Sequence, residues 1–598
     1  MAAGGFATLA ASSTNLHVRP CVNRAASTTP NRGIALPARA GGSAGLLRSL
    51  ATLIAVLLAI PILAVLANLF LPGEGAWSHL AATVLPEYVA NTLWLLAGVG
   101  AMVIFGGVAT AWLVTMCQFP GRRVFEWALL LPMAMPAYIM AYAYTDFLQF
   151  TGPVQTWLRQ VTGWQARDYW FPEIRSVGGA VAMLGLVLYP YVYLVVRAAF
   201  LEQSIGIIEV GRTLGYGAWR SFFRIALPLA RPAIAAGTTL ALMETLADFG
   251  TVSYFAVPTF TTGIYRAWLA LGDRGAAAQL SALLLGFVAA VLLLERANRG
   301  RARFHNTSQR KRMVRHPLTG ARAAAAMFVC GLPLLFGFGL PTGLLLQLAL
   351  TAGDAQLGAR FGTLAFNSFT LAGVTAATGI VLALVMAYAL RLHPGPLVRA
   401  ANRLAGLGYA VPGAVIAIGI LVPVARLDNV IDAWMRAHFD LSTGLLLTGS
   451  IAALVYAYLV RFLAVALQTV EAGLSKVTPS MDEAARSLGV GPLGTVAKIH
   501  APLLRGSLLT AGLLVFVEVM KELPATFVMR PFNFDTLAVQ AYNLAADERL
   551  SEASTAALAI VAVSVLPIIL VSRRIARSQL RADQVPAAAV VPTIAPTR

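Results

Sequence analysis

Glu483-Ala484-Ala485-Arg486-Ser487-Leu488-Gly489-Val490-Gly491, followed by Ile499-His500-Ala501-Pro502, has a second copy in this chain. The other copy lies earlier, at an offset of 274 in the numbering, as from Glu483 back to Glu209. It reads Glu209-Val210-Gly211-Arg212-Thr213-Leu214-Gly215-Tyr216-Gly217, followed by Ile225-Ala226-Leu227-Pro228. A charged loop repeated this closely inside an apolar chain indicates a two-fold device whose copies both meet something outside the apolar body.

The composition around the repeat is that of a membrane protein. Hydrophobic residues make up 58% of the chain and charged residues 12%, whereas soluble domains carry about 25% charged residues. Apolar runs long enough to cross a bilayer recur along the chain. We expect an all-α polytopic fold with about twelve spans, near 49–71, 90–116, 124–148, 177–199, 232–257, 277–295, 323–350, 366–390, 402–425, 444–466, 505–529 and 552–572.

Arginine and lysine gather at three places, which are the start of the chain, its middle and its end. In an even-span topology all three lie on the same side as the two repeated loops, and the positive-inside rule makes that side cytoplasmic. We therefore expect both termini in the cytoplasm. The net charge of +19 is explained by this topology and predicts no nucleic-acid binding, because the bases sit in short loops between spans that contact membrane lipid.

The repeat divides the chain into two copies of one plan. We expect a disordered basic cytoplasmic extension (1–46), a first half (47–295), a basic cytoplasmic linker (296–322), a second half (323–572) and a cytoplasmic tail (573–598). A transit peptide is the alternative for residues 1–46, which are rich in Arg and Ser and contain no acid. Two parallel six-span halves favour a pathway between them.

Further matches support the two halves. Asn91-Thr92-Leu93 and Met135-Pro136-Ala137 correspond to Asn367-Ser368-Phe369 and Val411-Pro412-Gly413, both at an offset of 276. Tyr191-Val192-Tyr193 before Arg197 is matched with Tyr456-Ala457-Tyr458 before Arg461. The three cysteines, Cys21, Cys117 and Cys330, show no disulfide framework or metal-ligand spacing, so no metal site is assigned from them.

The second loop predicts a short helix-turn-helix. Thr478 can cap a helix and Pro479 suits its first turn, while Asp482 and Glu483 favour a helix N-terminus. Gly489 and Gly491 end this helix, and we expect a second short helix up to Pro502, with the span beginning after it. The alternative is an interfacial helix on lipid headgroups, in which Glu209 and Glu483 pair with Arg212 and Arg486.

This pattern closely resembles the signature loop of binding-protein-dependent ABC importer permeases. The matching residues are Glu483, Ala484, Ala485, Gly489, Ile499 and Pro502, and Glu209, Gly215, Ile225, Leu227 and Pro228. The docking loops also include Gly491 and Gly217. Val210 and Gly211 stand where alanines are usual. The resemblance implies that both loops dock on two copies of a separate ATPase subunit, which bind ATP and Mg, and that a periplasmic binding protein delivers the substrate across a bacterial inner membrane. The chain contains no phosphate-binding loop, so we expect a transport subunit that binds no cofactor, not an enzyme.

Charged residues inside two predicted spans are candidates for the transport pathway. Glu244 and Asp248 are spaced i,i+4, as are Glu518 and Glu522, and Lys521 lies beside the second pair. Intramembrane carboxylates are functional candidates by default, and these residues can line a central route for a hard, oxygen-preferring cation. The alternative is a structural role, in which Lys521 neutralises Glu518 or Glu522.

The segments around these carboxylates resemble, more narrowly, the fused ferric-iron permeases. The resembling segments are 241–251, 520–526 and 530–538. Fused thiamine and aminoalkylphosphonate permeases share the architecture and remain alternatives. Tyrosines in the spans can serve as ferric ligands or as packing residues, namely Tyr138, Tyr142, Tyr144, Tyr189, Tyr191, Tyr193, Tyr456 and Tyr458. A proton-coupled secondary transporter of twelve spans is the alternative from another class.

Overall fold

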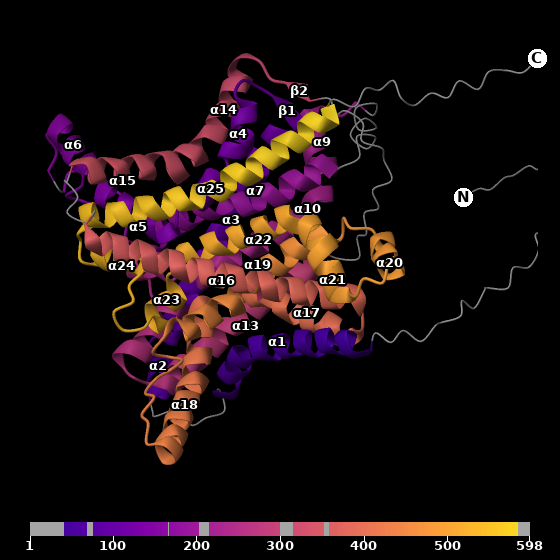
Figure 1. Ribbon diagram of the computed structural model, residues 1–598. Coiled ribbons are helices and arrows are strands. Elements are labelled where there is room, and N and C mark those ends of the chain that lie inside the picture. The colour runs from indigo at the N-terminus through magenta and orange to yellow at the C-terminus, as the bar shows by residue number, and fades with distance from the viewer. Residues whose placement is uncertain are drawn as a thin grey trace, which may run out of the picture.

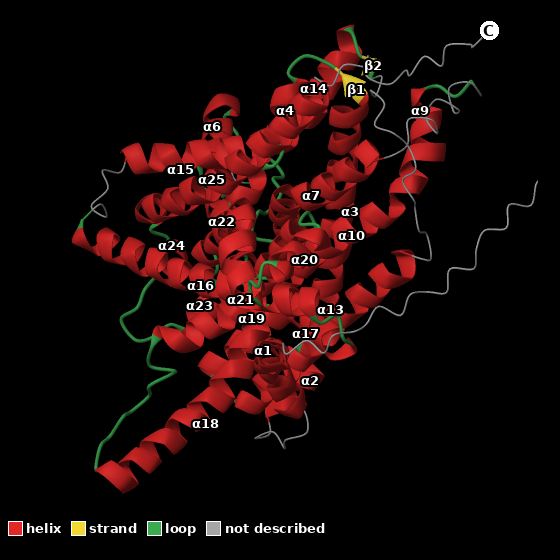
Figure 2. Ribbon diagram, turned by 45° about the vertical axis from the view of Figure 1, so that its right-hand side comes forward, coloured by secondary structure: helices red, strands yellow, loops and turns green. Residues whose placement is uncertain are grey.

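The computed structural model describes residues 41–68, 76–165, 167–202, 215–299, 315–351 and 358–583. Within this part of the chain nearly all regular structure is helical, and the only sheet is a parallel pair of two-residue strands (Figures 1 and 2). The expected all-α polytopic fold is confirmed. Eleven helices are long and apolar enough to cross a membrane, or up to twelve if a bent helix pair counts as one span, in the described residues.

The elements of the first half, with η for 3₁₀ and π segments, are α1 (Gly41–Asn68), α2 (Ala76–Thr83), α3 (Leu85–Met116), β1 (Cys117–Gln118), α4 (Arg122–Ala128), η1 (Leu131–Ala134), α5 (Ala137–Leu148), α6 (Pro153–Thr162), α7 (Val177–Glu202), α9 (Ala218–Ser221), η2 (Phe222–Ala226), α10 (Leu227–Ala247), α11 (Gly250–Tyr254), α12 (Phe260–Tyr265), η3 (Arg266–Ala270) and α13 (Arg274–Arg299).

Those of the second half are β2 (His316–Pro317), α14 (Gly320–Leu334), η4 (Leu335–Gly339), α15 (Leu340–Thr351), α16 (Ala359–Leu392), α17 (Pro396–Leu407), η5 (Gly408–Ala410), α18 (Gly413–Phe439), α19 (Ile451–Leu474), α20 (Pro479–Ser487), α21 (Pro492–Thr495), η6 (Val496–His500), α22 (Ala501–Met520), α23 (Pro524–Met529), α24 (Leu537–Ala546) and α25 (Leu550–Asp583).

The spacing found in the repeated loop extends through the fold. The starts of α7, η2 and α10 correspond to the starts of α19, η6 and α22, in each case at the same offset of 274. Asn91 and Asn367 also play the same part, since their side-chain amides donate to the carbonyls of Pro258 and Asp535, at 2.9 and 3.0 Å. The two halves are therefore repeats in structure as well as in sequence.

The third and ninth predicted spans are each interrupted. Residues before proline are pushed out of the helical region, and Met135 and Val411, which precede Pro136 and Pro412, are both extended. In the first half the helices on either side of the break meet at 89°. In the second half α18 continues as one helix to Phe439, well beyond the expected end near 425. Figure 1 shows its far end projecting from the bundle.

The prediction that a helix ends at Pro228 and at Pro502 is wrong. The helix runs through both prolines, from Ala218 to Ala247 and from Pro492 to Met520. A π segment precedes each proline, and Leu227 and Ala501 donate to the carbonyls five positions back, at Phe222 and Val496. The wider π turn accommodates a proline ring without ending the helix. The spans accordingly begin earlier than expected and end earlier as well.

The first long helix of each half packs on the opposite half. α1 contacts α16, α17 and α18, whereas α14, η4 and α15 contact α3, α4, α5 and α7. Tyr144 Oη donates to the Phe336 carbonyl at 2.6 Å, and Tyr456 Oη donates to the Leu57 carbonyl. The close approach of Gly419 to Pro61, where a side chain would clash, tightens the α1–α18 contact. This interlocking ties the halves together.

Several segment boundaries proposed from the sequence fall in regions that the structure describes only in part. Residues 1–40, 300–314 and 584–598 lie outside the described residues, so the extension, most of the linker and the tail are not tested. α1 begins at Gly41 and α25 continues to Asp583, so helix extends into both predicted terminal segments. The end of the linker contacts the first half, where β2 pairs with β1 and Arg315 Nε donates to the Thr115 carbonyl at 3.3 Å.

Candidate functional site

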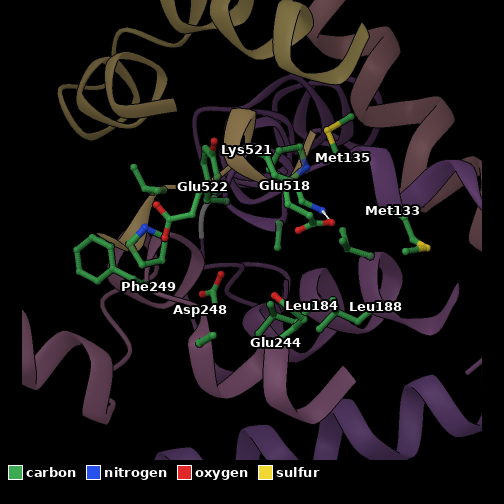
Figure 3. Close-up of a pocket in the computed structure, with 18 of the residues that line it drawn as sticks. Met133, Met135, Leu184, Leu188, Glu244, Asp248, Phe249, Glu518, Lys521 and Glu522 are labelled. Carbon is green, nitrogen blue, oxygen red and sulfur yellow. Dashed lines mark ion pairs between the residues drawn. The ribbon is translucent and has the colours of Figure 1, made fainter. Parts of the chain in front are cut away.

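A cavity of about 110 Å³ lies between the two halves. All five charged residues selected from the sequence line it, namely Glu244, Asp248, Glu518, Lys521 and Glu522. Figure 3 shows Glu244 and Asp248 on one side, with Glu518, Lys521 and Glu522 on the other. The remaining wall is mostly apolar and includes Met133, Met135, Leu184, Leu188 and Phe249. The structure thus brings together residues from two regions that are far apart in sequence.

Asp248 and Glu522 also serve the helices that follow them. The Asp248 carboxylate accepts hydrogen bonds from the amides of Thr251 and Val252, both at 3.1 Å. The Glu522 carboxylate accepts from the amides of Ala525 and Thr526, at 2.9 and 3.0 Å. Both carboxylates therefore satisfy otherwise unpaired donors at the first turns of α11 and α23.

The i,i+4 spacing predicts that the two members of each pair lie on one face of a continuous helix, and this prediction is wrong. α10 ends at Ala247 and α22 ends at Met520, so Asp248 and Glu522 lie beyond the helices that carry Glu244 and Glu518. The backbone at Asp248 is already extended. The i,i+4 spacing assumed a continuous helix, whereas the break is what turns all four carboxylates toward one cavity.

Arg461 of α19 connects the two halves across the cavity. Its guanidinium lies 3.4 Å from Glu244 of the first half and 3.4 Å from Glu522 of the second. Lys521 lies 2.9 Å from Glu518. The Arg461 and Glu522 side chains are nearly inaccessible to water, at 8% and 1% exposure, whereas Glu244, Glu518 and Lys521 keep about a fifth of theirs. Four carboxylates thus face two bases in a site that is only partly accessible.

Sequence reasoning did not select Arg461, because it matched Arg461 with Arg197. The helix starts show that the match is wrong. At the spacing of 274, Arg197 is equivalent to Glu471, and Arg461 to Val187. Arg197 pairs with Glu126 of α4, away from the cavity. A usable signal was present, since Arg461 lies ten positions after the start of α19, or about 15 Å, inside an apolar span, where a charge is costly and commonly functional.

The cavity is asymmetric in charge. Its carboxylates are contributed equally, because Glu244 and Asp248 of the first half correspond to Glu518 and Glu522 of the second. Both bases come from the second half, and the first-half residues equivalent to Arg461 and Lys521 are Val187 and Ala247, which also line the cavity. The second half therefore supplies all the positive charge that its wall holds.

An aromatic cluster formed by both halves lies beside the cavity. It consists of Phe249, Tyr265, Phe527 and Tyr542, with ring centroids 5.7 Å apart for Phe249–Phe527 and 5.3 Å for Phe527–Tyr542. Ser253 Oγ lies 2.9 Å from Tyr542 Oη, across the same junction. These rings follow the ends of α10 and α22, on the side away from the repeated loops. They close the interface between the halves next to the cavity.

Most of the tyrosines considered as metal ligands have structural partners. Tyr189 and Tyr193 donate to the carbonyls of Leu129 and Glu126, both at 2.8 Å, and Tyr144 and Tyr456 make the bonds between halves described above. Tyr458 contacts Thr526, and Tyr142 is buried beside Tyr138 and Tyr254. Only Tyr138 and Tyr191 of this set line the cavity. Among the described residues, no group of three or more His, Cys, Asp or Glu side chains is arranged to hold a metal ion.

The second repeated loop forms the short helix α20, as the sequence predicted. It begins at Pro479, although Thr478 makes no side-chain cap. Gly489 ends it at φ +75°, and the amides of Gly489 and Val490 donate to the carbonyls of Arg486 and Ala485. This pattern is a Schellman motif, which requires a left-handed residue. Gly215 has the same φ in the first loop.

Some of the signature residues are exposed and others are buried. Glu483 and Ala484 are exposed, and Ala485 is buried against the protein. Among the ion pairs of the described residues, of which Arg391–Asp482 is the one that involves α20 and an arginine, none joins Glu483 to Arg486. Leu488 is 80% exposed. Gly491 and Pro502 are exposed and Ile499 is half-buried. Of the first loop, Gly215 and Gly217 are exposed and Ile225, Leu227 and Pro228 half-buried, whereas Glu209 and Gly211 lie outside the described residues.

The left-handed residue at the end of α20 provides a local test. Gly489→Ala places a side chain at φ +75°, and we expect it to destabilise the last turn by about 1 kcal/mol or more. Hydrogen exchange of the α20 amides measures the effect. Gly491→Ala is the matched control, because Gly491 lacks a positive φ and no atom lies within 4 Å of its added Cβ. Equal exchange in the two variants would contradict the Schellman assignment.

Comparison with known proteins places the chain. Two segments, 103–299 and 379–582, each match the family described as binding-protein-dependent transport system inner membrane component. The chain is 24% identical to the Fe(3+)-transport system permease protein FbpB 2 of Haemophilus influenzae, over 81% of this chain and 90% of that protein. It is 23% identical to the ferric transport system permease protein FbpB of Actinobacillus pleuropneumoniae, over 84% of this chain and 73% of that one.

A further relative matches a shorter part of the chain. The molybdenum transport system permease protein ModB of Escherichia coli is 31% identical over 29% of this chain and 75% of its own length. The two family segments together cover most of the chain, and their starts differ by 276 in the numbering, in agreement with the structural repeat. The apolar helices and the inner-membrane family together indicate a multi-pass inner membrane protein. The chain belongs to the binding-protein-dependent transport system inner membrane components, as a transport permease subunit with two permease domains fused in one polypeptide.

Proposed function

We propose that this chain is the membrane-spanning subunit of an ATP-driven importer that moves ferric iron from a periplasmic binding protein into the cytoplasm by alternating access. The observation that carries the proposal is the charged cavity between the halves. Four carboxylates converge on it, and α10 and α22, which lead to it, begin at the two repeated loops. Each loop is therefore connected to the cavity by one continuous helix, which can transmit a movement of the loop.

The carboxylates favour a hard cation as the substrate. Ferric iron prefers oxygen ligands, and Glu244, Asp248, Glu518 and Glu522 supply them from both sides. The long relatives that span most of the chain carry ferric transport in their names. Arg461 and Lys521 lower the affinity of the site for a cation, because a passing ion has to compete with them for the same carboxylates. Weak, shared binding suits a pathway that must also release its substrate.

The partners follow from family membership. We expect two copies of an ATPase subunit, with ATP and Mg bound on them, to dock on the exposed faces of the repeated loops. A substrate-binding protein would engage the opposite, periplasmic side. This arrangement puts both termini in the cytoplasm, which agrees with the arginine and lysine distribution. Family membership also weighs against a proton-coupled carrier, for which uptake would persist without ATP.

An oxyanion is the second candidate substrate. Arg461 and Lys521 are the observation that favours it, since both bases line the cavity and guanidinium suits planar or tetrahedral oxyanions. A half-length relative carries molybdenum transport in its name. Competition in one uptake assay separates the candidates, with radiolabelled Fe(III), molybdate, thiamine and an aminoalkylphosphonate offered to the same vesicles. Thiamine and aminoalkylphosphonate are included as alternative substrates because of the sequence resemblance alone.

Neutralising one carboxylate from each half tests the cavity. We expect Glu244→Gln/Glu518→Gln to reduce ATP-dependent Fe(III) uptake at least about tenfold, which corresponds to about 1.4 kcal/mol in the barrier. The physical reason is that Arg461 and Lys521 each lose an ion-pair partner and the wall loses its net negative charge, because only Asp248 and Glu522 then remain to face the two bases. Uptake in proteoliposomes that contain the ATPase and binding protein is the measurement.

Glu552→Gln is the control for that experiment. Glu552 forms an ion pair with Arg549 near the surface, away from the cavity, and its loss is expected to leave uptake unchanged because exposed pairs contribute little. Unchanged uptake in the Glu244/Glu518 double variant would assign those residues a structural role. A carrier mechanism would show itself as uptake by wild-type protein in vesicles without ATP.

A further inference from the structure

A buried polar cluster attaches α20, the helix of the second repeated loop, to the membrane helices. It consists of Arg391 at the end of α16, Asp482 of α20 and His500 at the end of η6. Arg391 Nε donates to Asp482 Oδ2 at 2.8 Å, and His500 Nε2 lies 2.7 Å from Asp482 Oδ1. Arg391 therefore holds one oxygen of this carboxylate by a hydrogen bond, and the His500 ring lies in contact with the other oxygen.

Arg391 extends the cluster to a fourth element. Its two terminal nitrogens donate to the carbonyls of Leu474, in the last turn of α19, at 2.8 Å, and of Val477 at 2.9 Å. The planar guanidinium offers donors in fixed directions. Arg391 therefore fixes the end of α19 and the connection into α20 in one rigid arrangement with α16.

The cluster is shielded from water. The His500 side chain is fully buried, with its ring against Tyr388 at a centroid distance of 5.5 Å, and Asp482 and Arg391 are 13% and 16% exposed. Ion pairs at exposed sites are weakened by solvent, whereas a shielded pair is hard to break once formed. This joint is therefore stiffer than the ion pairs on the protein surface.

The covalent connection on the far side of α20 runs through two glycines and carries no side-chain bond comparable to that of Arg391 among the described residues. Gly489 and Gly491 join α20 to α21, and glycine permits more backbone conformations than any other residue. From His500 onward, α22 is continuous to Met520. Glu518 lies about 27 Å from His500 along this helix, at the usual rise of about 1.5 Å for each position. A displacement of Asp482 is thus transmitted through His500 and along α22 to the cavity, and does not have to pass through the glycines.

The first half does not repeat these residues. At the spacing of 274, Asp482 corresponds to Ile208 and His500 to Ala226. Arg391 corresponds to Thr115 at the spacing of 276 that Asn91 and Asn367 define for this helix. The first-half segment equivalent to α20 lies outside the described residues, so the comparison is one of sequence. None of the three first-half side chains carries a charge, although each equivalent in the second half can.

We propose that Arg391, Asp482 and His500 form a coupling clamp that transmits movement of α20 to α22 and the cavity, and that the second half carries the larger share of this coupling. The proposal rests on the ATP-driven import proposed above. The three are positioning residues, because they act through α22 and contact no substrate. The clamp and the two cavity bases lie in the same half, so the half that receives the stronger pull also holds Arg461 and Lys521.

The test separates coupling from folding. Asp482→Asn and Arg391→Leu are placed in full-length chain reconstituted with the ATPase and binding protein, and radiolabelled Fe(III) uptake and ATP hydrolysis are measured in the same vesicles. We expect hydrolysis to continue while uptake per ATP falls at least about fivefold. Arg391→Lys keeps the charge but not the fork of donors, and should restore part of the ratio. Lys498→Ala, an exposed position within η6, should leave it unchanged.

A second measurement does not depend on transport. In the purified chain, Asp482→Asn should speed hydrogen exchange at the α20 amides at least about tenfold relative to wild type, because α20 loses its held carboxylate. Unchanged exchange would overturn the clamp. An unchanged ratio of uptake to hydrolysis, or a parallel fall of both, would overturn its coupling role. Wild-type vesicles that hydrolyse ATP without taking up iron would instead overturn the proposed function, and the exchange result would still decide the clamp.

Discussion

Arg461→Leu is expected to abolish uptake and to destabilise the protein. The change leaves Glu244 and Glu522 facing each other across the cavity without the guanidinium that lies 3.4 Å from each. Removing one member of a buried charge pair typically costs about 3–5 kcal/mol. Without Arg461, Glu244 of the first half loses its ion pair with the second half. The substitution therefore alters the cavity wall and lowers the stability of the protein. Uptake of Fe(III) and thermal unfolding of the purified chain measure the two effects.

Arg197→Leu is a matched control for this prediction. Arg197 is similarly buried and pairs with Glu126, but it lies outside the cavity. Both variants are expected to lose stability by comparable amounts, and only Arg461→Leu is expected to lose uptake at a temperature where both remain folded. Equal uptake in the two variants would show that Arg461 acts only in stability. Arg461→Lys, which keeps the charge with fewer donors, should fall between wild type and Arg461→Leu.

The double variant Glu209→Ala/Glu483→Ala is expected to lose ATP-driven uptake about a hundredfold while still inserting in the membrane. A hydrogen bond to a charged group contributes about 1.5–3 kcal/mol, so each lost contact with an ATPase subunit should cost about tenfold or more. Glu483 is exposed and has no ion-pair partner in the described part of the chain, which leaves its carboxylate available. Uptake, ATP hydrolysis and co-purification of the ATPase are the measurements.

The single variants make this prediction sharper. Because only the second copy has both alanines and the clamp, Glu483→Ala should be more harmful than Glu209→Ala. Glu552→Gln again serves as the control that removes a carboxylate without touching a docking loop. Normal uptake by the double variant would refute docking through these residues. Equal losses in the two single variants would instead mean that the two docking sites are equivalent.

The repeated loop and the apolar runs were enough to predict the fold class. A long apolar segment has few structural options in a bilayer, and two copies of one charged loop define two halves. The same local signals located Glu244, Asp248, Glu518, Lys521 and Glu522, because a charge inside an apolar run is visible without any knowledge of its neighbours. Gly489 was likewise predictable as a helix end from its type and position.

Only the tertiary structure decided which of these residues meet. Arg461 is far from Glu244 in the sequence, and nothing local indicates that α19 presents it to the other half. The interlocking of α1 with α16–α18, the π turns that carry the helices through Pro228 and Pro502, and the Arg391–Asp482–His500 clamp were equally hidden. Sequence determines hydrophobicity, turn chemistry and repeat spacing, which are short-range properties. Contacts between distant segments depend on how rigid helices pack against one another. An error in aligning the two halves therefore moves a side chain to a different place on its helix: Arg197 is equivalent to Glu471, and not to Arg461.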